Sequence, residues 1–166
     1  MSSECWDETA GAALTQRQDQ TDDTRSYQPP ATTVPGSVMA RVTLSASGAA
    51  RPEAVWERYA SVDQWASWSP QIKAVHSVSR RLRPGMSGSV ESVAGIRAAF
   101  VVEAVDDDRH TWTWRVRLGR IQIQLHHEVR PHEHGTTTSL TMHGPKLALL
   151  AYAPLARLAL HRLVQP

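Results

Sequence analysis

Histidine and tyrosine are the residues of this 166-residue chain best suited to acid–base chemistry. His127 lies between Leu125 and Val129 in a segment whose alternation predicts a strand with all three side chains on one face. Burying an unpaired polar ring costs about 1–3 kcal/mol, so His127 needs a partner, a water or a ligand. Two interpretations stay open: a neutral core histidine bonded to a neighbour, or an acid or base inside a pocket.

Three further polar residues are candidates for the same pocket. Tyr152 lies on a predicted C-terminal helix and could polarise a carbonyl. His110 falls on the apolar face near a strand end. The face of His76 stays open, because the turn at Arg83-Pro84-Gly85 allows two registers. If the protein is an enzyme, we predict His127 and Tyr152 as its catalytic residues.

Other reaction types lack their usual residues. The only cysteine, Cys5, lies outside the structured pattern, so we expect neither Cys-based catalysis nor a disulfide within the chain. His126 and His127 point to opposite faces of a strand, and His132 and His134 lie at a hairpin tip without a third ligand. We therefore predict no metal site. No glycine-rich phosphate loop or G-x-S-x-G turn occurs, and we predict no cofactor.

The elements that must position these residues follow a simple order. An alternating strand at 40–47 precedes a short helix beginning at Pro52 and a second turn or two carrying Trp65 and Trp68. A long leucine-rich helix at 144–165 ends the chain, and Pro154 should kink it or open its hydrogen bonds. Between them, turn residues separate six predicted strands, at 72–81, 87–93, 96–105, 109–118, 121–130 and 136–143. This order predicts an α+β fold with an antiparallel sheet packed on a helix.

The hairpin turns predict which side chains share a face. A two-residue turn at Gly119-Arg120 pairs Trp114 with Leu125 and Trp112 with His127. The neighbouring loops then predict the pairs Phe100–Trp114, Val102–Trp112, Leu140–His127 and Met142–Leu125. The apolar face collects Ala98, Phe100, Val102, Ala104, Trp112, Trp114, Val116, Ile121, Ile123, Leu125, Val129, Leu140 and Met142. The opposite face is polar and rich in arginine.

Residues 1–38 differ in composition from the rest. They are rich in Ser, Thr, Gln, Asp and Pro, which predicts a disordered polar tail before a single domain at 39–166. The tail carries a net charge of −4, so the domain carries +6. No apolar run is long enough to span a bilayer, no secretory signal pattern occurs, and no aromatic-basic nucleic-acid motif accompanies the charge. We expect a cytoplasmic protein that binds no nucleic acid.

The domain resembles the START-like helix-grip superfamily, and within it the polyketide cyclase/dehydrase and lipid-transport family. The resemblance rests on "RPEAVWERYASVDQWASWSPQI", "LRPGMSGSV", "VEAVDDDRHTWTWRV" and "HGPKLALLAYAPLARL", in this order over residues 40–165. It implies a seven-stranded antiparallel sheet wrapped around the C-terminal helix, with two short helices after the first strand. It also implies a hydrophobic cavity between sheet and helix, and Trp56, Trp65 and Trp68 at one end of the sheet. We assign Trp56 to the core, since it shares a stripe with Val55 and Tyr59.

Three functions fit these observations. The first is binding of a lipid-, quinone- or polyketide-like molecule in the cavity. The second is a cyclase or dehydratase in which His127 moves a proton and Tyr152 polarises a carbonyl. The third is a protein-interaction module with a filled cavity and a partner on the basic outer face. The predicted ligand-binding residues are Trp65, Trp68, Phe100, His110, Trp112, Trp114, Leu125, Leu140 and Met142.

Overall fold

The computed structural model describes residues 38–166, so the tail predicted for 1–38 lies outside the described residues except for Val38. Seven antiparallel strands form one sheet in the order β1-β7-β6-β5-β4-β3-β2. The strands are β1 (Met39–Gly48), β2 (Ile72–Ser77), β3 (Ser87–Ser92), β4 (Arg97–Asp106), β5 (Thr111–Leu118), β6 (Ile121–His132) and β7 (Gly135–Pro145). The helices are α1 (Pro52–Ala60), η1 (Val62–Gln64), α2 (Trp65–Trp68) and α3 (Lys146–Leu163). The predicted order of elements is confirmed.

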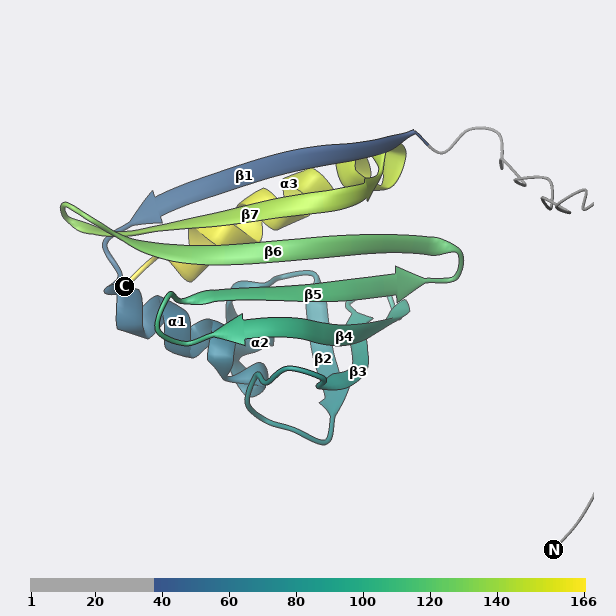
Figure 1. The fold of residues 1–166 in the computed structure, drawn as a ribbon, viewed down its shortest axis with the longest axis horizontal. Helices are drawn as coiled ribbons and strands as arrows, with labels where there is room; N and C mark the ends of the chain where they lie inside the picture. Colours follow the sequence, from purple (N-terminus) through teal and green to yellow (C-terminus); the bar gives the residue numbers. More distant parts are fainter. Residues whose placement is uncertain (1–37) are drawn as a thin grey trace, which may run out of the picture. The chain divides into compact units, whose positions relative to one another are not determined.

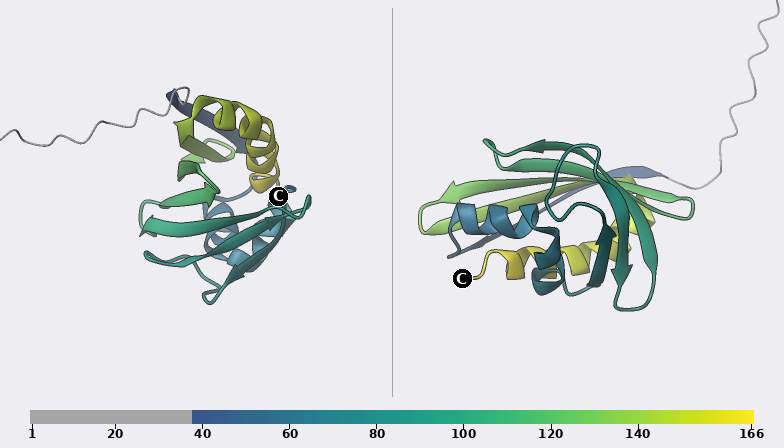
Figure 2. Two further views of the ribbon diagram at one scale, coloured as in Figure 1. Left: turned by 90° about the vertical axis from the view of Figure 1, so that its right-hand side faces the viewer. Right: turned by 90° about the horizontal axis from the view of Figure 1, so that it is seen from below.

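All the helices lie on one side of the sheet, which curves around them (Figure 1, Figure 2). α1 begins at Pro52, where the missing N–H is not needed, and it buries Val55, Trp56 and Tyr59. α2 is a single turn that buries Trp65 and Trp68. The curved sheet and these helices therefore enclose the apolar face of the strands.

The long helix α3 packs across β1 and β7 and also contacts α2. It continues through Pro154, which is exposed. At its C-terminal end the backbone lies against β1, where a Cβ atom on Gly48 would come within 2.3 Å of the Val164 carbonyl oxygen. Only glycine fits this approach. The Ala50 N–H donates to the same carbonyl at 3.1 Å, and this bond fixes the end of α3 on the sheet.

The predicted register is confirmed on one side of β5 and wrong on the other. Trp114 pairs with Leu125 and Trp112 with His127, as the two-residue turn predicted. The pairs Leu140–His127 and Met142–Leu125 are also present. On β4, however, Phe100 pairs with Val116 and Val102 pairs with Trp114. The shift arises from two features together: the turn after β4 spans four residues, 107–110, and a bulge lies in β4 between Val102 and Ala104.

A β-bulge in β4 causes a second difference. Between Val102 and Ala104 the strand advances two residues while β5 advances one, which leaves Glu103 as the extra residue. Beyond the bulge, the positions that were predicted to face inward face outward, and the reverse. Ala104, predicted on the apolar face, is exposed, and Val105 packs against the core instead.

Candidate functional site

Near α1 and α2, closely packed aromatic side chains fill the concave side of the sheet. Trp65 and Trp112 are each 1 % exposed. The ring centroids of Trp65, Trp112 and Trp114 lie 5.2–5.5 Å from one another, within the range of favourable aromatic contacts. Phe100 packs against Trp65 and Trp114 at 5.9 and 5.6 Å. We call this region the aromatic end.

Each tryptophan of the two short helices uses its N–H within the fold. Trp65 donates to the Tyr59 carbonyl at 2.8 Å and Trp68 to the Arg58 carbonyl at 3.1 Å. Trp56 donates to Asp107 Oδ1 at 3.0 Å and stacks on His110 with a centroid distance of 5.2 Å. These bonds anchor α1 and α2 to each other and α1 to the turn between β4 and β5. All three tryptophans are buried, as assigned for Trp56.

His127 lies inside the aromatic end and is held by a continuous hydrogen-bond chain. Its Nε2 accepts from the Trp114 indole N–H at 3.1 Å, because an indole can only donate. Its Nδ1 therefore carries the proton and donates to Tyr59 Oη at 3.2 Å. The Tyr59 hydroxyl donates in turn to Thr138 Oγ1 at 3.0 Å, and Thr138 donates to the Glu128 carbonyl at 3.1 Å. Every polar atom in this chain has a partner.

Burial sets the charge state of His127. Removal from water, with a smaller contribution from nearby His126, lowers the pKa of His127 from 6.5 to about 3. Burial also raises the pKa of Tyr59 above its usual value. The His127 ring stacks on the Trp112 ring with a centroid distance of 4.4 Å and an interplanar angle of 8°. At neutral pH His127 is thus an uncharged ring with both nitrogen atoms bonded.

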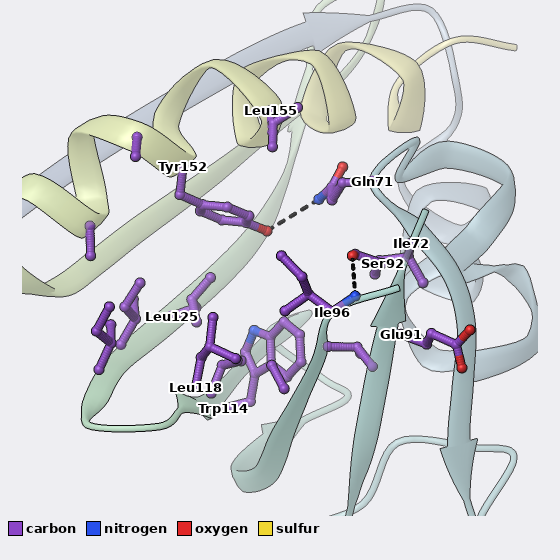
Figure 3. A pocket seen from close by; sticks show the side chains of 17 residues that line it. Gln71, Ile72, Glu91, Ser92, Ile96, Trp114, Leu118, Leu125, Tyr152 and Leu155 are labelled. Carbon is purple, nitrogen blue, oxygen red and sulfur yellow. Dashed lines mark hydrogen bonds between the residues drawn. The ribbon is translucent and has the colours of Figure 1, made fainter. Parts of the chain in front are cut away.

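The other end of the concave side is hollow. A cavity of about 420 Å³ lies between the sheet and the N-terminal half of α3 (Figure 3). Its wall is almost entirely apolar and includes Ile72, Val116, Ile123, Ala148, Ala151 and Leu155. Of the predicted site residues, Trp114, Leu125 and Tyr152 line it. We call this region the cavity end.

The remaining predicted site residues lie elsewhere. Five border a much smaller void of about 20 Å³, about the size of one water molecule: Trp65, Trp68, Trp112, His127 and Leu140. Phe100, His110 and Met142 border neither space. His76 is exposed on β2 and contacts Glu91 at 3.2 Å. The structure therefore brings Trp114, Leu125 and Tyr152 together at the cavity. His127 does not line it and instead borders the small void, which adjoins the cavity because Gln71, Ile72, Trp114 and Tyr152 line both.

Several cavity residues were missed as site residues in the sequence. Ala98, Val116, Ile121 and Ile123 were placed on the apolar face but not in a site. Ala148 and Ala151 could have indicated the cavity from the sequence. They put two small side chains on the face of the last helix that also carries Tyr152 and Leu155, beside a large apolar sheet. Small residues at such an interface leave room between helix and sheet.

Two polar side chains meet at the cavity wall. Gln71 Nε2 donates to the Tyr152 hydroxyl oxygen at 3.2 Å, and Figure 3 shows this hydroxyl pointing from α3 towards Gln71. The Tyr152 hydrogen has no acceptor among residues 38–166, and burial raises the pKa of this hydroxyl, so it stays protonated. Gln71 Oε1 is buried without a partner among these residues, as is Trp112 Nε1. The Tyr152–Gln71 pair thus keeps a donor and an acceptor unused.

The other polar side chains at the cavity, Ser92 and Glu91, already have hydrogen-bond partners within the fold. The Ser92 hydroxyl accepts from the Ile96 N–H at 3.1 Å within the β3–β4 turn. The Glu91 carboxylate is turned away from the cavity and bonds to Lys73, His76 and Arg97 (Figure 3). These bonds lower the pKa of Glu91 to about 2.

Residues 38–166 contain no group of three or more His, Cys, Asp or Glu side chains placed to hold a metal ion. No helix among them is long and apolar enough to cross a membrane. At the cavity, the Tyr152 hydroxyl and the Gln71 amide keep hydrogen-bonding capacity that no residue among 38–166 uses.

Comparisons with known proteins agree with this architecture. No curated protein matches the sequence. Among solved structures, the crystal structure of Ara h 8.0201 is similar with a TM-score of 0.57 and 10 % identity, over 74 % of this chain and 96 % of that one. That likeness shows the helix-grip fold. The family described as polyketide cyclase/dehydrase and lipid transport matches residues 39–165, and the chain belongs to this family.

Proposed function

We propose that the protein binds one lipid-, quinone- or polyketide-like molecule in the cavity between the sheet and α3. The observation that carries this proposal is the 420 Å³ cavity itself, which has an apolar wall and one polar pair. Ligand sites for small molecules typically measure about 300–1,000 Å³ and place few polar groups in a largely hydrophobic surface. Family and fold are consistent with hydrophobic ligand binding.

The Tyr152–Gln71 pair would fix the orientation of the ligand in the cavity. A hydroxyl or carbonyl group on the ligand would accept from the Tyr152 hydroxyl, whose hydrogen has no acceptor within the described part of the chain. The apolar remainder would lie along Ile123, Leu125 and Val116. A net gain of about 0.5–1.5 kcal/mol is typical of one such hydrogen bond. Most of the affinity would therefore come from burial of the apolar part.

Binding is better supported than acid–base catalysis by His127. A general base must reach the proton that it removes within about 3 Å. His127 does not line the cavity, and Trp114 donates to the nitrogen that would act as the base. Tyr152 remains available to polarise a carbonyl, so a ligand that is also converted would be handled by this hydroxyl.

Filling the cavity tests the proposal. Ala148 lines the cavity, whereas its neighbour Leu147 is 79 % exposed. With Nile red as the fluorescent probe, we expect one binding site per chain and an affinity about tenfold lower in Ala148→Phe, because the new ring occupies the cavity. Leu147→Phe is the matched control and should bind as the unaltered protein does. Equal binding in both variants would place the probe elsewhere and overturn the proposal.

The natural ligand can be sought separately. Native mass spectrometry of the protein purified from its own host should show a stoichiometric apolar adduct, which extraction would identify. Conversion of that molecule by the unaltered protein but not by His127→Gln, with capture unchanged, would support the cyclase or dehydratase alternative instead.

A further inference from the structure

The outer face of α3 is apolar although it is exposed. Leu147, Leu150, Pro154 and Leu158 recur every three or four residues and so form one stripe along the helix. All four are exposed, and the exposed fraction of the leucines reaches 79 % at Leu147. The opposite face of α3 packs on β1, β7 and α2, and Figure 2 shows no described element over the outer face. α3 therefore has two apolar faces, of which only one packs against other elements of residues 38–166.

This outer face continues into the rim of the cavity. Ala151 and Leu155 lie beside the stripe, are exposed, and also line the cavity. Across the cavity the rim is formed by three more exposed apolar residues, Ile96, Leu118 and Ile121. A monomeric soluble protein rarely leaves so continuous an apolar surface uncovered.

The charges around this surface have one sign. The charged residues of α3 are Lys146, Arg157 and Arg162, and the helix contains no acid. Near the other rim, Arg120 is exposed in the β5–β6 turn, and Arg117 and the Glu91-bonded Arg97 are exposed next to the cavity-lining Val116 and Ala98. The only acid at the cavity, Glu91, already bonds to Lys73, His76 and Arg97. The surface is therefore apolar in its centre and basic at its edge.

We propose that the outer face of α3 and the adjoining cavity rim dock on a lipid bilayer with anionic head groups. The leucines would enter the boundary between head groups and acyl chains, and the arginines would meet phosphates, as in interfacial amphipathic helices. Charge complementarity favours this occupant over a second copy of the chain. Because α3 carries Lys146, Arg157 and Arg162 and no acid, a two-fold contact through this face would set basic residues of one copy against basic residues of the other. The proposal does not depend on what the cavity holds.

Vesicle flotation of the full chain tests the docking. We expect binding to vesicles of phosphatidylcholine mixed with phosphatidylglycerol, weak binding to phosphatidylcholine alone, and a decrease with added salt. In the triple variant Leu147→Gln, Leu150→Gln, Leu158→Gln, binding should fall by about tenfold or more. Arg157→Gln and Arg162→Gln should each lower it roughly fivefold on anionic vesicles only.

Two exposed residues away from this surface supply the controls. Val78 is 95 % exposed in the segment after β2, and Arg83 is exposed in the following turn. Val78→Gln and Arg83→Gln should bind vesicles as the unaltered protein does. Nile red binding in the triple variant should also be unchanged, which separates this proposal from the cavity proposal.

Three results would overturn the docking proposal. One is no vesicle binding by the unaltered chain. A second is binding that the triple variant retains. The third is a dimer in sedimentation that the triple variant converts to a monomer, which would make this face a contact between copies of the chain.

Discussion

The concave face of the sheet is apolar at both the aromatic end and the cavity end, but side chains fill the space at the first and leave it open at the second. At the aromatic end, the rings of Trp65, Trp112 and Trp114 meet one another and leave a void of about 20 Å³. At the cavity end, Ala148 and Ala151 face the sheet and about 420 Å³ stays open. The helices facing the sheet differ between the two ends: α2 places Trp65 and Trp68 against the sheet, whereas α3 places Ala148 and Ala151 there, and the space stays open beside the smaller side chains.

Hydrogen bonding follows the same division except at Trp112 of the aromatic end, whose N–H is buried without a partner among residues 38–166. At the aromatic end the chain from Trp114 through His127 and Tyr59 to Thr138 is complete. At the cavity end the Tyr152 hydroxyl keeps a hydrogen without an acceptor in residues 38–166. A completed chain stabilises and positions, whereas an incomplete one is available to a ligand. Trp114 lies between the two regions, since its ring borders the cavity and its N–H joins the chain.

The largest expected difference between the two ends is in the cost of removing a side chain. Trp112→Ala should lower the free energy of unfolding by about 3–5 kcal/mol, because the aromatic end cannot collapse into the space. Ile123→Ala, in a cavity wall that already borders open space, should cost about 1 kcal/mol. Urea denaturation of the ligand-free proteins measures both. Similar costs at the two positions would mean that the cavity closes in solution and would break the comparison.

The sequence predicted the inner face well because hairpin turns fix register. The two-residue turn at Gly119-Arg120 was enough to pair Trp112 with His127. The bulge at Glu103 could not be predicted from the sequence. Ala104 and Val105 are both apolar, so either of them could be the residue that faces inward. One extra residue then exchanges which of them faces inward.

The cavity could not be located from the strands alone. Alternation shows which side chains face inward, but not how far along the strand a helix fills the space. That depends on where α3 lies, and its position is fixed by contacts remote in sequence, such as Gly48 against Val164. The same limit applied to His127. Its place on the inner face was predictable, but its tautomer and its separation from the cavity depend on Tyr59 and Trp114.

The next largest effect concerns the buried Tyr59 and the partly buried Tyr152, one of which we expect to matter for stability and the other for ligand binding. Tyr59→Phe should lower the free energy of unfolding by about 1–3 kcal/mol, because His127 and Thr138 lose their shared partner. Tyr152→Phe should cost about 1 kcal/mol or less, because the only hydrogen bond of the Tyr152 hydroxyl within residues 38–166 is to Gln71 at the cavity wall. Urea denaturation checks both values.

Ligand discrimination should show the reverse order. Displacement of Nile red by octanol and by octane compares ligands with and without a hydroxyl group. We expect Tyr152→Phe to lose about five- to tenfold of the preference for octanol, and Tyr59→Phe to keep it. If Tyr59→Phe lost the preference instead, the polar end of the ligand would lie at the aromatic end, and the assignment of the two regions would be reversed.

The last expected effect is absent at neutral pH and appears only on acidification: it is the pH dependence of stability. Because burial lowers the pKa of His127 from 6.5 to about 3, the unfolded chain binds a proton in this window that the folded chain does not accept. The stabilisation is therefore complete above pH 6.5 and decreases as the pH falls towards 3, by about 1.4 kcal/mol per pH unit. His127→Gln, whose amide does not titrate, should remove this part of the slope, and His132→Gln, in water at the end of β6, should not. Denaturation series between these pH values measure the slope. An unchanged slope in His127→Gln would mean that water and protons reach this ring from the cavity, and the aromatic end would then be accessible enough for His127 to act as an acid or base.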